Sequence, residues 1–280
     1  MHQFRKILIG VAFSPNLKEN IFEAIRLSNM FNAQLICVHV GDRSEKKEAL
    51  LQDILKEGHQ VTNDVKLLFQ TGAPVDVILN VCEQEKIDLL ILGALQKENI
   101  FKYYVGSIAR KLTRKTPCSV LLLIKHSVVR IPCKHIVVNG LKDPKTAETM
   151  ATSFYVSQKL GCKKITIVEE ITQREIHVKV NDDISLRRAT IAKEKLAKRE
   201  DIRVKDILDI IETPLKNGID IKTQSIFGKR GYSIGHYARV VRADLLIMNA
   251  PNKTGMLDRI FPHDMEYILS ELPSDLLIVK

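Results

Sequence analysis

The 280-residue chain is long enough for one large domain or for two domains of ordinary size. Its apolar content of 45% and charged content of 27% are typical of a soluble globular protein, and no apolar run approaches the roughly 20 residues that a membrane-spanning helix needs. The net charge of +10 is spread over both halves, aromatic residues make up 5% of the chain and tryptophan is absent. This pattern argues against nucleic-acid binding, which favours clustered basic residues with aromatic side chains for stacking.

The cysteines and histidines show no spacing typical of a metal site or a disulfide framework. None of the five cysteines forms a CxxC pair, and the eight histidines are dispersed without an HExxH pattern. Cys37 and Cys82 lie among apolar residues and are expected to be small core residues in a reducing compartment. Because the first residues pass directly into a strand-like segment, no signal peptide is recognised and a cytoplasmic location is expected.

The first half alternates short apolar runs with segments of helical periodicity. The predicted strands are residues 4–12, 34–40, 65–70, 88–93 and 119–124, and helices are predicted at residues 16–31, 46–57, 76–85 and from 108 onward. Five strands separated by helices predict a parallel, doubly wound α/β sheet of the Rossmann-like kind.

The second half repeats this pattern. Its predicted strands are residues 135–140, 164–169, 219–225, 244–249 and 276–279, and its predicted helices are residues 147–160, 185–211 and 234–241. The run Lys86–Leu92 recurs as Arg242–Met248, and Thr116–Leu122 recurs as Leu272–Ile278. A repeat of this length predicts two tandem copies of one domain, residues 1–127 and 134–280.

Residues 171–218 have no counterpart in the first half. Residues 172–181 alternate polar and apolar side chains and predict an extension of the sheet or a hairpin, whereas residues 185–211 predict a charged helix. We favour a longer helix that covers the sheet over a device for binding a partner or for dimerisation.

Three local signatures together carry a resemblance to a known family. They are an opening strand with a short loop at Ile7–Ser14, a second strand at Ile36–Val40, and the run Asp88–Gly93 followed by Gly106-Ser107 and Thr116–Leu121. Over nearly its whole length the chain resembles the universal stress protein family in its tandem, UspA-like form. The resemblance implies two five-stranded parallel sheets and a role in binding and regulation during stress.

Members of this family that bind ATP carry two glycines separated by two residues, and then, after nine residues, a glycine followed by serine or threonine. Glycine lets the backbone approach phosphates closely, and free amides at a helix start favour anions. The resemblance therefore implies a nucleotide site in the first copy, where Val40 lies near the adenine and Ala12 stands where the family has an aspartate. The phosphate positions are Gly93, Gln96, Gly106 and Ser107.

Two of these positions lack the family residue. Gln96 replaces the second glycine and Ala12 replaces the aspartate, so we expect ATP binding in the first copy to be weak or absent. Two interpretations of the nearby basic residues stay open. They supply charge to phosphates or, as we favour, they are ordinary solvated residues: Lys97, Lys102 and Arg110.

The second copy departs further from the family pattern, and no ATP site is expected there. The corresponding residues are Leu141 at the aspartate position, with Asp143 two residues later, and Asn249, Asn252, Pro262 and His263 at the cradle positions. The glycine-rich stretch Gly228–Gly235 predicts either an anion-binding helix start or, as we favour, simple turns. It contains a GxSxG match, but Ser233 is expected to cap a helix rather than to act as a nucleophile.

No catalytic or metal-binding constellation emerges, and no cofactor other than ATP is indicated. We expect a binding and regulatory protein that is not an enzyme. A ligand-free interaction scaffold, or a nucleotide-hydrolysing enzyme of the wider nucleotide-binding α/β group, remain the alternatives. Residues 119–124 and 276–279 are short, apolar edge strands, and the resemblance implies that they meet in an intramolecular pseudo-dimer or in self-association. The identity of any other small-molecule or protein partner stays open.

Overall fold

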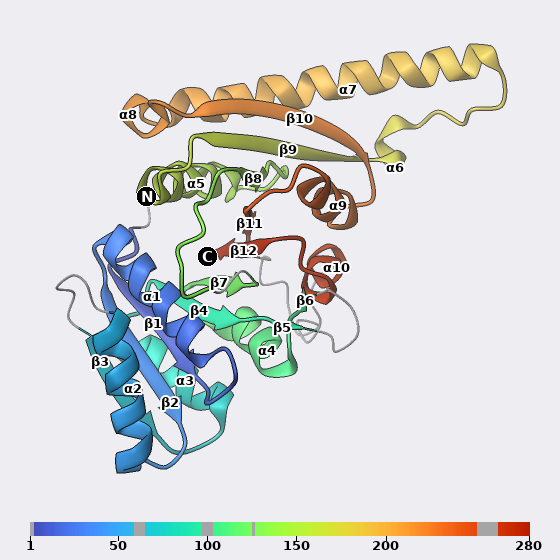
Figure 1. Ribbon diagram of the computed structural model, residues 1–280. Coiled ribbons are helices and arrows are strands. Elements are labelled where there is room, and N and C mark those ends of the chain that lie inside the picture. Colours follow the sequence, from blue (N-terminus) through green and yellow to red (C-terminus); the bar gives the residue numbers. More distant parts are fainter. Residues whose placement is uncertain (1–2, 59–64, 97–102, 125–126, 251–262) are drawn as a thin grey trace. The chain divides into compact units, whose positions relative to one another are not determined.

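The computed structural model describes residues 3–58, 65–96, 103–124, 127–250 and 263–280 (Figure 1). The chain forms two compact units, residues 1–132 with 274–280, and residues 133–273. This division places the last strand with the first unit, whereas the predicted domains assign it to the second.

The first unit is built on a sheet of strand order β12-β7-β4-β1-β2-β3. Five strands are parallel, and β12 pairs with β7 in the antiparallel direction. The strands are β1 (Lys6–Val11), β2 (Gln34–Val40), β3 (Val65–Gln70), β4 (Leu89–Gly93), β7 (Ser119–Leu123) and β12 (Asp275–Val279). This order confirms the predicted doubly wound sheet.

Helices cover both faces of this sheet. One pair, α1 (Leu17–Phe31) and α2 (Glu45–Gly58), packs together, and so does the pair α3 (Pro74–Gln84) and α4 (Ser107–Lys115). The central strand contributes the fully buried run Ile7-Leu8-Ile9, because a strand covered on both faces exposes neither set of its side chains. A two-stranded ribbon, β5 (Leu95–Gln96) and β6 (Tyr103–Tyr104), precedes α4.

The two terminal strands pair as predicted. Leu276, Leu277 and Ile278 of β12 stand opposite Leu122, Leu121 and Val120 of β7. The pairing covers the β7 edge with buried apolar side chains, so that this edge is not left as an exposed template for another chain.

The second unit contains a parallel sheet of order β10-β9-β8-β11. Its strands are β8 (Ile136–Asn139), β9 (Lys164–Thr172), β10 (Asp220–Gly228) and β11 (Leu245–Asn249). Its helices are α5 (Thr146–Leu160), α6 (Gln173–Ile176), α7 (Asp183–Ile210), α8 (Thr213–Lys216), α9 (Tyr232–Val240) and α10 (His263–Ser270).

The predicted hairpin over residues 172–181 is wrong, and the alternative, an extension of the sheet, reaches only Thr172. The strand β9 runs on to Thr172, and α6 begins at Gln173 with a capping box. The carboxylate of Glu175 accepts hydrogen bonds from the Thr172 amide at 2.7 Å and from the Thr172 hydroxyl at 2.8 Å. These bonds satisfy the first turn of a helix, and they outweigh the alternating pattern that suggested a strand.

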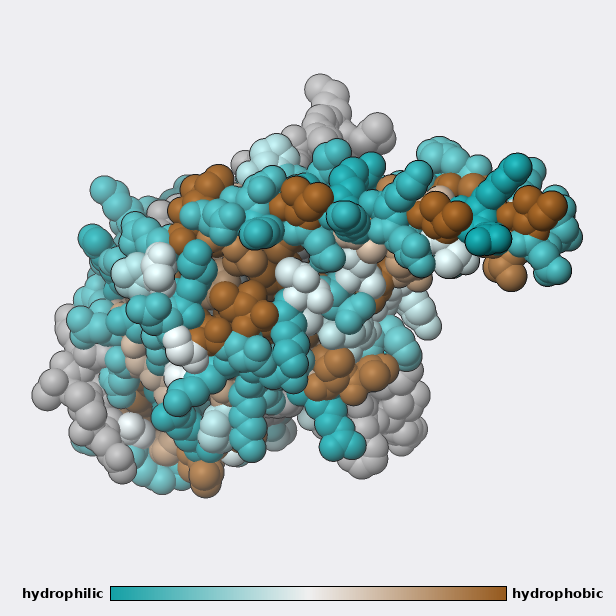
Figure 2. Space-filling view, turned by 90° about the horizontal axis from the view of Figure 1, so that it is seen from above, coloured by the Kyte–Doolittle hydropathy of each residue, from teal (hydrophilic) through white to brown (hydrophobic). Residues whose placement is uncertain are grey.

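The long helix α7 covers β9 and β10, which confirms the covering role predicted for residues 185–211 (Figure 1). Its outer face nevertheless carries apolar side chains between charged ones, and Figure 2 shows brown patches among teal along this helix. Five apolar side chains of α7 are 45–82% exposed: Ile184, Leu186, Ile191, Ile202 and Ile210. The interpretation of this segment as a partner-binding device therefore stays open.

Candidate functional site

The candidate site of the first unit lies at the carboxyl edge of β1 and β4. The strand β1 stands between β2 and β4, so the chain connections run in opposite directions from it, and open α/β sheets bind ligands at such a switch point. Ala12 directly follows β1, Val40 ends β2 and Gly93 ends β4. The parallel ladders place these three residues at one edge of the sheet, where Ala12 and Gly93 are exposed.

Asn20 of α1 reaches this edge and was missed by the sequence analysis. A Cβ built on Gly93 would lie 3.3 Å from the Asn20 Nδ2 atom, so a side chain there would press on this amide. The Oδ1 atom of Asn20 and the Oε2 atom of Glu19 are buried without a hydrogen-bond partner in the part of the chain that the structure describes. The signal was available, because the helix that follows the first strand of a doubly wound sheet begins at the ligand edge.

The start of α4 supplies the phosphate end of the candidate site. Gly106 is the N-cap and has an extended backbone (φ −65°, ψ 166°). Because glycine has no side chain, it gives the helix no side-chain capping bond. Ser107 at the first helical position is exposed. The first turn contains no acidic residue, so its amides meet no carboxylate from their own helix. A Cβ on Gly106 would lie 2.9 Å from the Leu95 Cδ1 atom, so glycine also serves the packing of β5 here.

The segment between Gly93 and Gly106 contains a short β ribbon. Gln96 lies on β5 and stands opposite Tyr103 of β6 in an antiparallel pair. The position of the missing family glycine is thus part of a β ribbon. The predicted alternative charges Lys97 and Lys102 lie outside the described residues.

Arg110 is used by the protein itself. Its Nε donates a hydrogen bond to the Val105 carbonyl oxygen at 2.8 Å, and burial lowers the pKa of its guanidinium. This contact favours a structural role at the start of α4.

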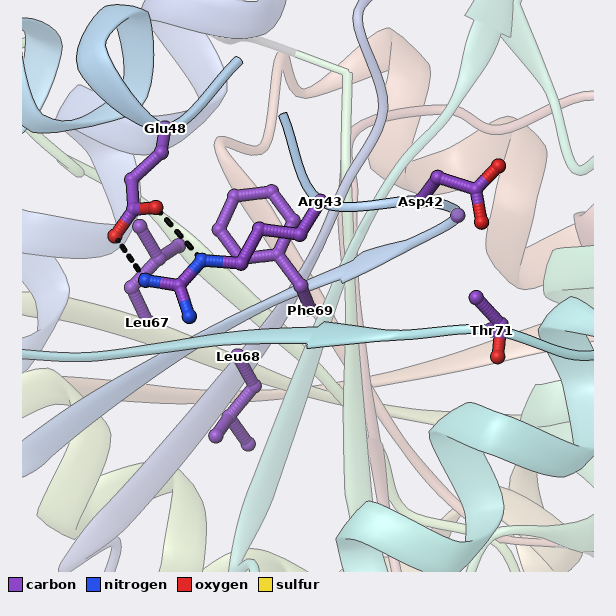
Figure 3. A pocket seen from close by; sticks show the side chains of 8 residues that line it. Asp42, Arg43, Glu48, Leu67, Leu68, Phe69 and Thr71 are labelled. Atoms are coloured by element: carbon purple, nitrogen blue, oxygen red, sulfur yellow. Dashed lines mark hydrogen bonds and ion pairs between the residues drawn. The ribbon is translucent and has the colours of Figure 1, made fainter. Parts of the chain in front are cut away.

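A separate pocket of about 510 Å³ opens at the ends of β2 and β3 (Figure 3). Arg43 pairs with Glu48 through two bonds of 2.7 and 2.8 Å, and its guanidinium lies 6.0 Å from the Phe69 ring centre. Because the Glu48 carboxylate neutralises Arg43, the pocket presents to a ligand an ion pair that is already formed, beside the ring of Phe69. None of the predicted site residues lines it; the lining residues are Gly41, Asp42, Arg43, Glu48, Leu67, Leu68, Phe69 and Thr71.

His39 is a buried histidine near the end of β2. Its Nδ1 is 3.0 Å from the Val11 carbonyl oxygen, and its ring packs edge-on against Phe13 and Phe69. Its Nε2 has no hydrogen-bond partner within the described ranges. The arrangement supports aromatic packing between β1, β2 and β3.

In the second unit, the helix start that follows the glycine-rich stretch is filled by the protein's own carboxylate. Glu170 accepts hydrogen bonds from the Gly231 amide at 2.9 Å and from the Ile234 amide at 2.8 Å. These amides at the start of α9 are the groups that an external anion would use. The structure therefore disfavours the anion-binding interpretation of residues 228–235.

The prediction that Ser233 caps α9 is wrong. Gly231 is the N-cap, with a positive φ of 75° that glycine adopts readily. The Ser233 Oγ accepts a hydrogen bond from the Lys229 amide at 3.0 Å, and a Cβ on Gly228 would lie 2.1 Å from that oxygen. The serine thus closes the preceding turn.

Arg203 of α7 occupies the carboxyl edge of β8. Its guanidinium donates a hydrogen bond to the Gly140 carbonyl oxygen, bonds to Glu200 at 2.7 Å and lies 3.7 Å from a Glu169 oxygen. Glu169 is buried, which raises the pKa of its carboxyl to about 7, and Ser225 Oγ donates to it at 3.2 Å. In the second unit, a cluster of charged side chains thus occupies the carboxyl edge of β8.

The remaining predicted positions of the second unit lie among hydrogen bonds within that unit or lie outside the described residues. The Asn139 Oδ1 accepts from the Leu141 amide at 3.2 Å, and the Asp143 carboxylate accepts from the Lys145 amide at 2.8 Å. Asn249 Nδ2 donates to the Thr146 hydroxyl at 3.2 Å. Asn252, Pro262 and the side chain of His263 are not described.

The described residues offer neither a metal cluster nor a membrane-spanning helix. They contain no group of three or more His, Cys, Asp or Glu side chains placed to hold a metal ion. None of their helices is long and apolar enough to cross a membrane.

Comparison with known proteins gives the family context. Residues 42–123 match the model of the Universal stress protein family. A universal stress protein of Methanothermobacter thermautotrophicus is 23% identical over 144 residues, covering 44% of this chain and 97% of its own. Universal stress protein MJ0531 of Methanocaldococcus jannaschii is 26% identical over 141 residues, covering 44% and 83%. These relatives match less than half of this chain, which is consistent with a chain that holds two copies of the domain.

Solved structures match the whole length. A universal stress protein of Archaeoglobus fulgidus superposes with a TM-score of 0.73 at 14% identity, covering 100% of this chain and 99% of its own. The functionally unknown protein PA1789 of Pseudomonas aeruginosa gives 0.66 at 15% identity, covering 99% and 92%. The resemblance to the universal stress protein family and the α/β fold with Rossmann-like sheets are confirmed.

Proposed function

We propose that this chain is a cytoplasmic stress-response protein that binds and regulates rather than catalyses, and whose first unit retains a degenerate adenine-nucleotide site. The observation that carries the proposal is the carboxyl edge of β1 and β4. It keeps Gly93 together with the uncapped start of α4 at Gly106 and Ser107, while Ala12 offers no carboxylate.

The contrast between the two units supports this assignment. In the second unit, Arg203 and Glu169 fill the corresponding edge, and Glu170 bonds to the first amides of α9. A nucleotide would have to displace an internal ion cluster there, which costs the desolvation of buried charges. Any adenine nucleotide should therefore bind the first unit.

The low affinity follows from the same residues. A hydrogen bond to a charged group contributes about 1.5–3 kcal/mol, and Ala12 cannot make one to the nucleoside. Gln96 on the β5–β6 ribbon replaces a glycine that would allow close approach to the phosphates. Since each 1.4 kcal/mol is about tenfold in affinity, these losses should weaken ATP binding by at least about tenfold relative to a site that has both residues.

A ligand-free interaction scaffold is the second candidate. It is favoured by the exposed apolar side chains on the outer face of α7, which a partner protein would cover. Because β7 and β12 pair with each other within one chain, the pairing favours an intramolecular contact of the terminal strands over association of two chains through these strands. A nucleotide-hydrolysing enzyme has the least support, because no activated group lies beside Gly106 among the described residues.

Calorimetric titration of the whole chain with ATP and Mg²⁺ tests the proposal. The whole chain is required because β12, at its end, completes the sheet of the first unit. We expect weak binding that Ser107→Ala weakens further and that Thr71→Ala, in the pocket at β3, leaves unchanged. Binding that is lost with Thr71→Ala but not with Ser107→Ala would assign the ligand to the pocket and refute the proposed site.

A further inference from the structure

Four of the five cysteines lie in two pairs of interacting thiols, one pair in each unit. Cys82 interacts with Cys118 in the first unit, and Cys133 interacts with Cys162 in the second. Cys37, Cys82 and Cys118 are all buried, which confirms the core role expected of Cys37 and Cys82. The pair in the second unit differs in both access and surroundings.

The sheet itself places Cys133 beside Cys162. In the parallel ladder of β8 and β9, Ile136 stands opposite Ile165. Cys133 precedes Ile136 by the same number of residues as Cys162 precedes Ile165. The two cysteines therefore lie just before the first residues of neighbouring strands. Neighbouring strands are about 4.8 Å apart, and a disulfide requires Cα atoms about 4.4–6.8 Å apart. The register of the two strands therefore brings Cys133 and Cys162 close enough together for their thiols to interact.

Only one thiol of the two pairs is within reach of solvent. Cys133 is half-buried, whereas Cys162 is 3% exposed. In the other pair, Cys82 and Cys118 are 1% and 5% exposed. A small oxidant in solution would thus reach Cys133 before Cys162, whose thiol interacts with that of Cys133.

The surroundings of Cys162 favour its thiolate. The thiol of Cys133 and the backbone amides of Lys164 and Ile136 lower the pKa of Cys162 to about 7, against an opposing contribution from burial. In the first unit, the hydrogen bond between the thiols raises the pKa of Cys82 and lowers that of Cys118. Thiolate character and access together determine which cysteines are oxidised, and the second unit combines both.

We propose that Cys133 and Cys162 form a modification site at which a hydroperoxide converts the two thiols into a reversible disulfide. The proton of Cys133 moves along the hydrogen bond to Cys162, and the Cys133 thiolate attacks the peroxide oxygen. An S–O bond forms, the O–O bond breaks, and hydroxide or an alkoxide leaves and takes a proton from water. Cys162 then attacks the Cys133 sulfenic acid, the S–S bond forms, and the S–O oxygen leaves as water with the Cys162 proton. The two thiols lose two electrons and the peroxide gains them.

The site lies at the start of the second unit. Cys133 directly follows residue 132, the last residue of the long segment of the first unit. Cys162 lies between α5 and β9. A disulfide would tie the start of the second unit to the turn after α5.

The test uses the full chain, reduced and freed of reductant, with hydrogen peroxide in small excess at neutral pH. Remaining thiols are alkylated in denaturant, and intact mass and peptide mapping follow. We expect two thiols to escape alkylation, one cross-linked peptide that joins Cys133 to Cys162, and recovery of all five thiols with dithiothreitol. A cross-link between Cys82 and Cys118, or irreversible oxidation of Cys133 with Cys162 still alkylated, would overturn the proposal.

Three variants separate the chemistry from a disturbance of folding, with circular dichroism as the check on fold. In Cys162→Ser, oxidation should stop at a sulfenic acid on Cys133 that a 1,3-diketone probe captures. In Cys133→Ser, thiol loss should slow markedly, while the control Cys118→Ser should lose thiols at the rate of the natural chain. Equal rates in Cys133→Ser and the natural chain would overturn the proposal.

Discussion

Asp88 and Asp244 hold the first strand of their respective units with the same pair of hydrogen bonds. In each case, one carboxylate oxygen accepts from two successive backbone amides that lead into the strand. The donors are Arg5 and Lys6 at 2.9 Å for Asp88, and Lys134 and His135 at 2.8 and 3.2 Å for Asp244. The internal repeat is thus preserved in hydrogen bonding as well as in sequence.

The neighbouring backbone repeats as well. Lys86 and Arg242, each two residues before the aspartate, adopt the left-handed conformation with φ of 54° and 53°. Such values are uncommon outside glycine, so their recurrence at equivalent positions indicates that both copies require the same tight turn between helix and strand.

Replacing either aspartate with alanine should destabilise the protein by a similar amount. Asp88→Ala and Asp244→Ala each remove the acceptor of one part-buried and one exposed amide, which costs about 1–2 kcal/mol because water can replace the acceptor only at the exposed amide. Urea unfolding of the full chain measures the loss, and Asp53→Ala on the exposed face of α2 is the matched control. A change no larger than that of the control in either variant would show that the carboxylate is not needed at the strand start.

Glu169 should give the protein a pH-dependent stability. Its carboxyl has a pKa of about 7 in the folded chain against an ordinary value of 4.5, so between these values the folded state holds a proton that the unfolded state has lost. Stability from this group is therefore full below about pH 4.5 and declines as the pH rises to about 7. Relative to Glu169→Gln, the natural chain should lose roughly 2–3 kcal/mol between pH 5 and pH 8.

Denaturant unfolding at these two pH values checks the effect, and Glu194→Gln on the exposed face of α7 serves as control. If the natural chain and Glu169→Gln change in parallel with pH, the buried carboxyl is ionised throughout. The ion cluster with Arg203 would then be stronger than burial alone implies.

Glu170 should be needed for the start of α9. Glu170→Ala removes the acceptor for the Gly231 and Ile234 amides and should destabilise the chain by about 2 kcal/mol, since buried donors are left unpaired. Because the vacated helix start favours anions, sulfate should restore more stability to Glu170→Ala than it adds to the natural chain. Equal effects of sulfate on both would mean that the amides find other partners.

The strands were predictable because their signals are local. Gln34–Val40 and Val65–Gln70 were placed to the residue, since continuous apolar or alternating patterns bounded by polar turns leave little freedom. The error at residues 172–181 was avoidable, because Thr172 and Glu175 have the spacing of a capping box.

The contacts that distinguish the two units were not predictable in the same way. Arg203 meets Gly140 across 63 residues, and Glu170 meets Gly231 across 61. No periodicity links residues so far apart, so their pairing is decided by how the helices pack on the sheet. Asn20 lies between these cases, because fold topology places it near the ligand edge while its contact with Gly93 needs coordinates.

The most direct test of a degenerate first-unit site is one calorimetric comparison with ATP and Mg²⁺. The natural chain is titrated beside the double variant Ala12→Asp with Gln96→Gly, which restores the nucleoside contact and the close-approach glycine. We predict weak or undetectable binding by the natural chain and a gain of at least about tenfold, or 1.4 kcal/mol, in the double variant. Tight binding by the natural chain, or no gain in the variant, would contradict the account and leave Gly93 and Gly106 with a purely structural role.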